Sequence, residues 1–136
     1  MVQTIKPLHK GGDIVNECQM ERLQVAKEFK ACQKAFNALG DETRQQIFVA
    51  LLEGERIGTR VGEITKRTHL SRPAVSHHLQ ILKDAGVINM HREGTMNYYY
   101  VDANENEWGR IKQLIDHVCT IVQKAAASGY PCIPED

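Results

Sequence analysis

The chain has 136 residues, with 17 basic and 17 acidic side chains, and 6% of its residues are aromatic. A net charge of zero argues against a strongly basic nucleic-acid binder, and the ordinary composition argues against wholesale disorder. No run of about 18 apolar residues occurs, and the N-terminus lacks an apolar stretch, so neither a membrane span nor a secretion signal is expected. We therefore expect a single domain over residues 1–136, located in the cytoplasm.

The N-terminal part of the chain is predicted to be a loose arm followed by a long helix. Pro7 and the glycine pair at residues 11–12 disfavour regular structure, so the arm is expected over residues 1–12. A helix is predicted over residues 13–39, because apolar side chains recur there at helical spacing. Its apolar positions are Val15, Cys18, Leu23, Ala26, Phe29, Cys32, Ala35 and Phe36.

Three shorter helices are predicted next. Asp41 is placed to cap the N-terminus of the first, which ends at Gly54. The second covers about residues 61–67. Ser71 is placed to cap the third, and Gly86 closes it.

The remaining chain is predicted to hold a β-hairpin and a final helix. Within residues 87–102, β-prone residues lie on each side of a turn at residues 93–95. The final helix is predicted over residues 104–127, and residues 128–136 read as a polar tail. The expected fold class is therefore mainly α with a small β-hairpin (α+β), in the order α-α-α-α-β-β-α.

The segment "LSRPAVSHHLQILKDAG", residues 70–86, combines an apolar face with an unusual polar face. Val75, Leu79 and Leu82 have the spacing of one buried side of a helix. The opposite side carries groups that donate hydrogen bonds, namely Ser71, Arg72, Ser76, His77, Gln80 and Lys83. A polar helix face is often only solvated surface, but more acidic side chains would then be expected.

Two short helices followed by a hairpin are the layout of a winged helix-turn-helix, whose second helix enters the major groove of DNA. Residues 60–100 carry six basic and three acidic side chains, so a neutral protein can still present a basic face. Arg72 suits a bidentate contact to guanine, and Gln80 suits one to adenine. The residues predicted to contact DNA are Arg67, Ser71, Arg72, Ser76, His77, Gln80, Arg92 and Thr95.

The order and spacing of four segments resemble the ArsR/SmtB family of bacterial winged-helix repressors. These segments are "ALGDETRQQIFVALLEG", "VGEIT", "LSRPAVSHHLQILKDAGVI" and "REGTMNYYYV", which together cover about residues 35–101. The resemblance implies a homodimer that binds a palindromic operator on double-stranded DNA and is released by an inducer. It also implies dimerisation through the first and last helices. The predicted interface residues are Phe29, Trp108, Ile111, Ile115, Val118 and Val122.

The family carries metal ligands at two sites, and this sequence has a complete set at neither. The third helix of the family bears a cysteine pair, but residues 61–67 here contain neither Cys nor His. Asp116 and His117 match the first half of a second family site, yet the later positions hold alanines. No metal site and no cofactor are therefore predicted, and a metal or thiol-reactive inducer remains open.

The chain has four cysteines, and no two of them form a C-x-x-C pair. In a cytoplasmic protein they are expected to be reduced thiols. Cys32 and Cys119 would meet if the first and last helices pack, which makes them candidates for a thiol sensor. Cysteine is also a common small residue of protein cores. The roles of Cys18 and Cys132 stay open.

The sequence favours a DNA-binding transcriptional regulator, most simply a repressor released by a small inducer or a thiol signal. An enzyme is not expected, because G-x-S-x-G, H-E-x-x-H and a phosphate-binding glycine loop are all missing. One alternative is a regulator without metal or thiol sensing, controlled by its expression or by protein partners. Another is a winged helix that contacts protein instead of DNA.

Overall fold

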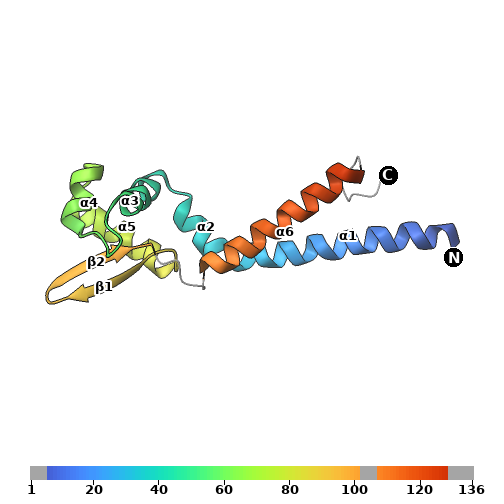
Figure 1. Ribbon diagram of the computed structural model, residues 1–136, viewed down its shortest axis with the longest axis horizontal. Coiled ribbons are helices and arrows are strands. Elements are labelled where there is room, and N and C mark those ends of the chain that lie inside the picture. The colour runs from blue at the N-terminus through green and yellow to red at the C-terminus, as the bar shows by residue number, and fades with distance from the viewer. Residues whose placement is uncertain (1–5, 102–106, 129–136) are drawn as a thin grey trace. The chain divides into compact units, whose positions relative to one another are not determined.

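The computed structural model describes residues 6–101 and 107–128 (Figure 1). These residues form six helices and one two-stranded antiparallel sheet, which confirms the predicted fold class. The elements are α1 (Lys6–Ala31), α2 (Gln33–Leu39), α3 (Glu42–Glu53), α4 (Val61–Thr68), α5 (Arg72–Asp84), β1 (Asn89–Glu93), β2 (Met96–Tyr100) and α6 (Glu107–Ser128). None of the described helices is long and apolar enough to cross a membrane.

The described elements belong to two compact units. The winged-helix unit comprises residues 32–110, and the helical pair comprises α1 together with α6 from residue 111 onward. Within the helical pair, Nδ1 of His117 lies 2.6 Å from a carboxylate oxygen of Glu28, and the Lys124 ammonium lies 2.7 Å from Glu21. Lys124 follows His117 by seven residues on α6, whereas its partner Glu21 precedes Glu28 by seven residues on α1. The two helices are therefore antiparallel.

The long helix predicted over residues 13–39 is in fact two helices. α1 begins at Lys6, inside the segment expected to be an arm, and ends at Ala31; α2 begins at Gln33. Cys32 between them is buried. The apolar spacing continues across the break because α2 buries Ala35 and Ala38 in the winged-helix unit. The final helix is described from Glu107 to Ser128, so the predicted start at residue 104 and the tail after residue 128 lie outside the described residues.

Both predicted helix caps are present. A carboxylate oxygen of Asp41 accepts a hydrogen bond from the Arg44 backbone N–H at 3.0 Å. This bond holds the pKa of the Asp41 carboxyl below its ordinary value, and the nearby charge of Arg44 acts in the same direction. The Ser71 hydroxyl accepts from the Ala74 backbone N–H at 3.2 Å. These bonds satisfy donors that the first turns of α3 and α5 leave unpaired.

The core of the winged-helix unit lies where α3, α4 and α5 pack together. Ile47, Ile64 and Leu79, one from each of these helices, are fully buried. Val75 and Leu82 are buried as well, as the apolar spacing predicts. The apolar face of α5 is therefore occupied, which leaves its polar face for other contacts.

The hairpin is anchored to the loop between α3 and α4. β1 pairs with β2 in the register that sets His91 opposite Tyr98. Thr59 and Tyr99 exchange two backbone hydrogen bonds of 2.8 and 2.9 Å. Gly94 in the turn has a φ of 63°, a conformation that glycine adopts without strain. The wing therefore has a fixed root beside the helix-turn-helix.

Candidate nucleic-acid interface

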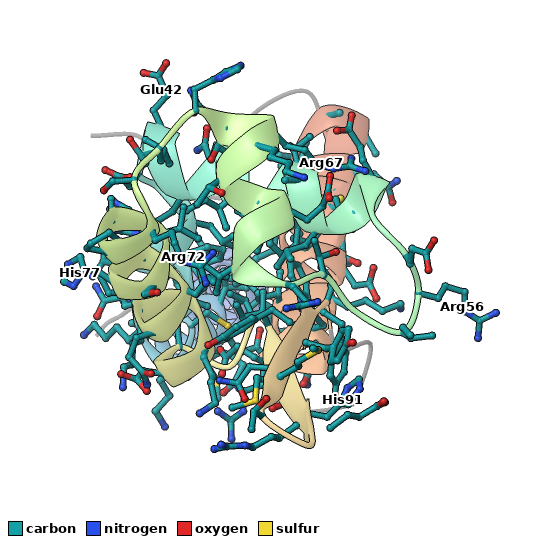
Figure 2. All side chains as sticks on the ribbon, turned by 90° about the vertical axis from the view of Figure 1, so that its left-hand side faces the viewer. Glu42, Arg56, Arg67, Arg72, His77 and His91 are labelled. Carbon is teal, nitrogen blue, oxygen red and sulfur yellow. The ribbon has the colours of Figure 1, made fainter. Side chains whose placement is uncertain are left out.

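The exposed face of α5 carries five of the eight residues predicted to contact DNA. Ser71, Arg72, Ser76, His77 and Gln80 are all exposed. Arg72, Ser76 and Gln80 follow one another at intervals of four residues, so they form one row along the helix. We call these five residues the α5 face. In Figure 2, His77 points away from the protein, while Arg72 lies between α5 and α4.

Gln80 has a hydrogen-bond partner within its own helix. Its Nε2 donates to a carboxylate oxygen of Asp84 at 2.8 Å, one helical turn further on. One amide hydrogen is thereby committed, and the carbonyl oxygen and the second hydrogen remain available. Asp84 was not among the residues predicted for this face, although the spacing of four residues is a signal for such a pair.

Arg67 lies apart from the α5 face, in the last turn of α4. Its guanidinium forms ion pairs with Glu63 at 3.6 Å and with Glu53 of α3 at 3.9 Å. It lines a cavity of about 550 Å³ between α3 and the end of α4. Both carboxylates are well exposed, so these pairs are weak and Arg67 can exchange them for a phosphate.

Arg92 and Thr95 lie at the exposed tip of the hairpin. Nε of Arg92 donates to the Gly94 carbonyl at 3.0 Å, so part of this guanidinium stabilises the turn. The same hairpin holds a cluster that sequence reasoning missed. His91 stacks on Tyr98, with ring centroids 5.3 Å apart, and its Nε2 lies 3.2 Å from a carboxylate oxygen of Glu93. Only the strand register reveals this cluster.

Residues 41–90 match the family profile described as "Bacterial regulatory protein, arsR family". An uncharacterized HTH-type transcriptional regulator of Methanocaldococcus jannaschii is 34% identical over 89 residues, which are 65% of this chain and 92% of that protein. The chain belongs to the arsR family of bacterial regulatory proteins. Its biochemical class is therefore a DNA-binding transcriptional regulator and not an enzyme.

Two further similarities support this arsR-family assignment. The arsenical resistance operon repressor of Bacillus subtilis is 33% identical over 92 residues, which are 68% of this chain and 82% of the repressor. The solution structure of a homodimeric winged helix-turn-helix DNA-binding domain from Mycobacterium bovis has a TM-score of 0.52 and 29% identity. That match covers 70% of this chain and 83% of the domain.

The predicted dimer-interface residues of this arsR-family protein fall into two groups. Phe29, Ile115, Val118 and Val122 have exposed fractions between 40 and 59%. Ile111 is buried, and Trp108 is half-buried in the winged-helix unit, where its Nε1 donates to the Val87 carbonyl at 3.0 Å. Met20 and Leu23 of α1 are also exposed and were not predicted as interface residues. Only the exposed residues offer a surface to a partner.

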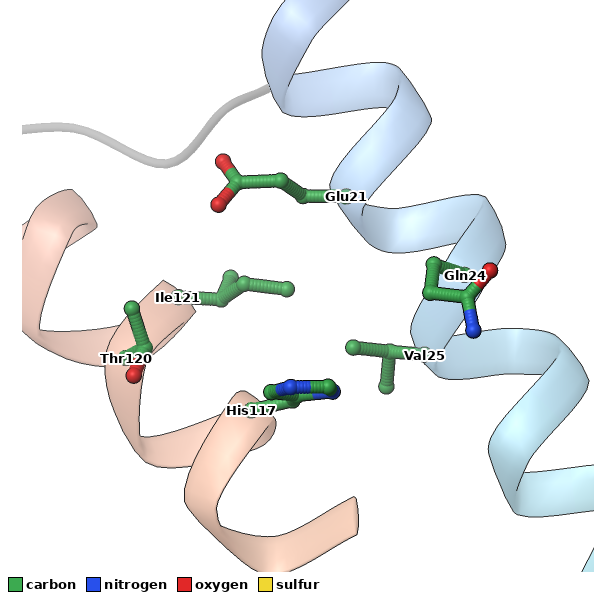
Figure 3. A pocket seen from close by; sticks show the side chains of 6 residues that line it. All are labelled: Glu21, Gln24, Val25, His117, Thr120 and Ile121. Carbon is green, nitrogen blue, oxygen red and sulfur yellow. The ribbon is translucent and has the colours of Figure 1, made fainter. Parts of the chain in front are cut away.

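The two helices of the helical pair enclose a cavity of about 240 Å³ (Figure 3). Its lining residues are Glu21, Gln24, Val25, His117, Thr120 and Ile121. Asp116 does not join them and instead binds Lys112 at 2.9 Å. Among the described residues, no group of three or more His, Cys, Asp or Glu side chains could hold a metal ion.

The cysteines differ from the expectation of four reduced thiols. Cys18 is disulfide-bonded, whereas Cys32 and Cys119 carry thiols. Cys32 is buried in the winged-helix unit and Cys119 is exposed on the helical pair. Cys132 lies outside the described residues. The expectation failed for Cys18 because sequence spacing does not show which cysteines come within bonding distance.

Proposed function

We propose that this protein is a homodimeric repressor that reads a palindromic operator with the α5 face. The observation that carries the proposal is the row formed by Arg72, Ser76 and Gln80, which is exposed along a helix whose apolar side is fully buried. A helix of 13 residues with one free polar face fits the major groove. An operator is part of the cell's DNA, which in bacteria lies in the cytoplasm, so the protein would work there.

The other predicted contacts would hold the protein on the phosphate backbone. Ser71 precedes the row on α5, and Arg92 and Thr95 lie at the tip of the wing, whereas His77 lies next to Ser76 and would contact bases together with the row. Arg67 is further away and would reach a phosphate only by leaving its two glutamates. Backbone contacts of this kind contribute affinity for every sequence, whereas the row supplies the preference for one operator.

A homodimer is supported by the exposed apolar residues of α1 and α6. Ile115, Val118 and Val122 form a stripe at spacings of three and four residues, and Leu23 and Phe29 are exposed on α1. A stripe of this kind on a water-exposed helix marks an interaction surface. A homodimer presents two copies of α5, which explains a palindromic operator with half-sites about one helical turn of DNA apart.

The proposed signal is a thiol-reactive or oxidising compound that acts on the protein while Cys18 is a reduced thiol, and the disulfide of Cys18 is the oxidised product. A disulfide in a cytoplasmic protein is rare and is usually catalytic or redox-sensing, and here it includes Cys18 of α1. Cys119 adds an exposed thiol on α6. A change at either residue lies on a helix of the proposed dimer interface. The Bacillus subtilis relative named for arsenical resistance supports arsenite as one member of this class of inducer.

Selection from a random DNA library, followed by fluorescence anisotropy, tests the reading face. Arg72→Ala should weaken binding to the selected operator by about 5- to 150-fold, the equivalent of one bidentate base contact. Lys112→Ala, an exposed cation on α6, serves as the control and should bind normally. If the two variants bind alike, Arg72 does not read the operator, and if Gln80→Ala also binds normally, the α5 face is not the reading surface.

The signal is tested on the same complex. The protein is first reduced with dithiothreitol and desalted, so that Cys18 starts as a thiol. Diamide, arsenite and Zn²⁺ are then titrated into the complex of wild-type protein with operator, and into the complexes of Cys18→Ser and Cys119→Ser. Release by diamide or arsenite in the wild type, lost in one of the serine variants, supports the thiol signal. Release by Zn²⁺ alone, or by none of the three compounds, contradicts it and favours a regulator controlled in another way.

A further inference from the structure

We propose that Gly62 is a positioning residue for the Arg72 guanidinium and thereby determines part of the base specificity of the α5 face. The inference rests on the proposed function, because it requires Arg72 to contact DNA. Gly62 is the second residue of α4, and Arg72 is the first residue of α5. Both residues belong to the winged-helix unit, and Figure 2 shows the Arg72 side chain between these two helices.

The backbone does not require glycine at position 62. Its φ lies outside the left-handed range, unlike that of Gly58 or Gly86. Glycine is also the poorest helix former after proline, and α4 has only eight residues. Alanine at this position would favour the helix. What limits the size of residue 62 is therefore a neighbouring side chain and not the backbone conformation.

That neighbour is the guanidinium of Arg72. A Cβ atom at position 62 would lie 3.3 Å from its Nη1, and nothing else in the surroundings comes within 4 Å. This separation is tighter than nine in ten contacts of real Cβ atoms, so the guanidinium would move by a few tenths of an ångström. Because Nη1 is the far end of a flexible side chain, the movement costs the fold little. The size of residue 62 therefore controls where the guanidinium lies.

The position of the Arg72 guanidinium is not fixed by a hydrogen bond or an ion pair to a described residue. Among the described residues, no carboxylate or carbonyl binds the Arg72 guanidinium, in contrast to Arg67 and Arg44. The positive ends of the α4 and α5 dipoles also do not attract a cation. A bidentate contact to guanine requires two N–H groups in a fixed geometry, so a small shift of the guanidinium weakens that contact.

The test compares Gly62→Ala with the matched control Gly109→Ala. Gly109 is likewise a helical glycine, and a Cβ atom there would meet nothing within 4 Å. Both variants should unfold at or above the wild-type temperature, because both improve helix propensity. Gly62→Ala should bind the selected operator about 3- to 10-fold more weakly, a fraction of a bidentate contact, whereas Gly109→Ala should bind normally.

Two further measurements separate positioning from a general effect. The double variant Gly62→Ala/Arg72→Ala should bind no more weakly than Arg72→Ala, because both changes act through one side chain. In the protein without DNA, the NMR signal of the Arg72 Nε–Hε group should move in Gly62→Ala and stay in place in Gly109→Ala. Additive losses in the double variant, or an unmoved Arg72 signal, would overturn the inference.

The same variants show whether the proposed function itself has failed. If Arg72→Ala binds the operator as tightly as the wild type, the α5 face does not read DNA through Arg72. The specificity assigned to Gly62 is then wrong as well, even where the NMR signal moves. If Arg72→Ala binds weakly and Gly62→Ala binds normally, the proposed function stands and only the role of Gly62 is rejected.

Discussion

Trp108 offers a sharp test of which α6 residues hold the winged-helix unit together and which face a partner. Its indole N–H donates to the carbonyl of Val87, a fully buried residue. The centroid of its ring lies 5.7 Å from the centroid of the Phe48 ring. Trp108→Phe keeps an aromatic ring and removes the donor. Leaving a buried acceptor without a partner costs about 1–3 kcal/mol, so we expect a loss of about 2 kcal/mol in the free energy of unfolding.

The corresponding change in thermal stability follows from the size of the chain. The entropy of unfolding is about 2 cal/mol/K per residue, so ~2 kcal/mol lowers the Tm of this 136-residue chain by roughly 7 °C. The assay is urea and thermal unfolding followed by far-UV circular dichroism, because Trp108 is the only tryptophan and fluorescence would lose its probe. Unfolding is measured at several protein concentrations, since the proposed dimer would also contribute to stability.

A dimer measurement decides between the two roles of Trp108. Trp108→Phe should dimerise as the wild type does in sedimentation experiments, because its indole is already engaged within the chain. Val122→Ala, a truncation on the exposed stripe of α6, is the comparison and should weaken the dimer with little change in the monomer fold. The reasoning is refuted if Trp108→Phe leaves the free energy of unfolding unchanged and weakens the dimer.

Three further perturbations have defined outcomes. Ile115→Glu places a charge on the exposed apolar stripe, so it should yield monomers with weakened operator binding, as sedimentation and anisotropy will show. Asp84→Ala releases Gln80 from its 2.8 Å hydrogen bond. We expect it to relax the base preference at the same operator position as Gln80→Ala does, and selection of operators with each variant measures this. If the two variants relax different positions, Asp84 does not act through Gln80. The folded protein holds the pKa of Asp41 below its ordinary 3.8, so stability present above about pH 4 is lost as the pH falls through the lower value. Asp41→Asn keeps the cap without the charge, so its Tm should fall less steeply than that of the wild type between pH 4 and 3, and equal slopes would argue against the carboxylate.

Local signals in the sequence were sufficient for the elements that depend on neighbouring residues. The caps at Asp41 and Ser71 could be predicted because each requires only an oxygen acceptor next to a helical first turn. The buried side of α5 could be predicted because Val75, Leu79 and Leu82 repeat at helical spacing. The hairpin followed from β-prone residues around a glycine turn. Together these elements determined the winged-helix order and with it the exposed α5 face.

The tertiary structure decided every feature that depends on which partner a residue meets. Apolar spacing continues through Cys32, so it does not show that α1 ends there and that α2 packs in a different unit. The same spacing grouped Trp108 with Val118, although Trp108 binds a carbonyl 21 residues away in the sequence. The disulfide of Cys18 and the space that Arg72 occupies over Gly62 likewise depend on distances between segments. Periodicity reports the character of a helix face, whereas only the folded chain determines what covers that face.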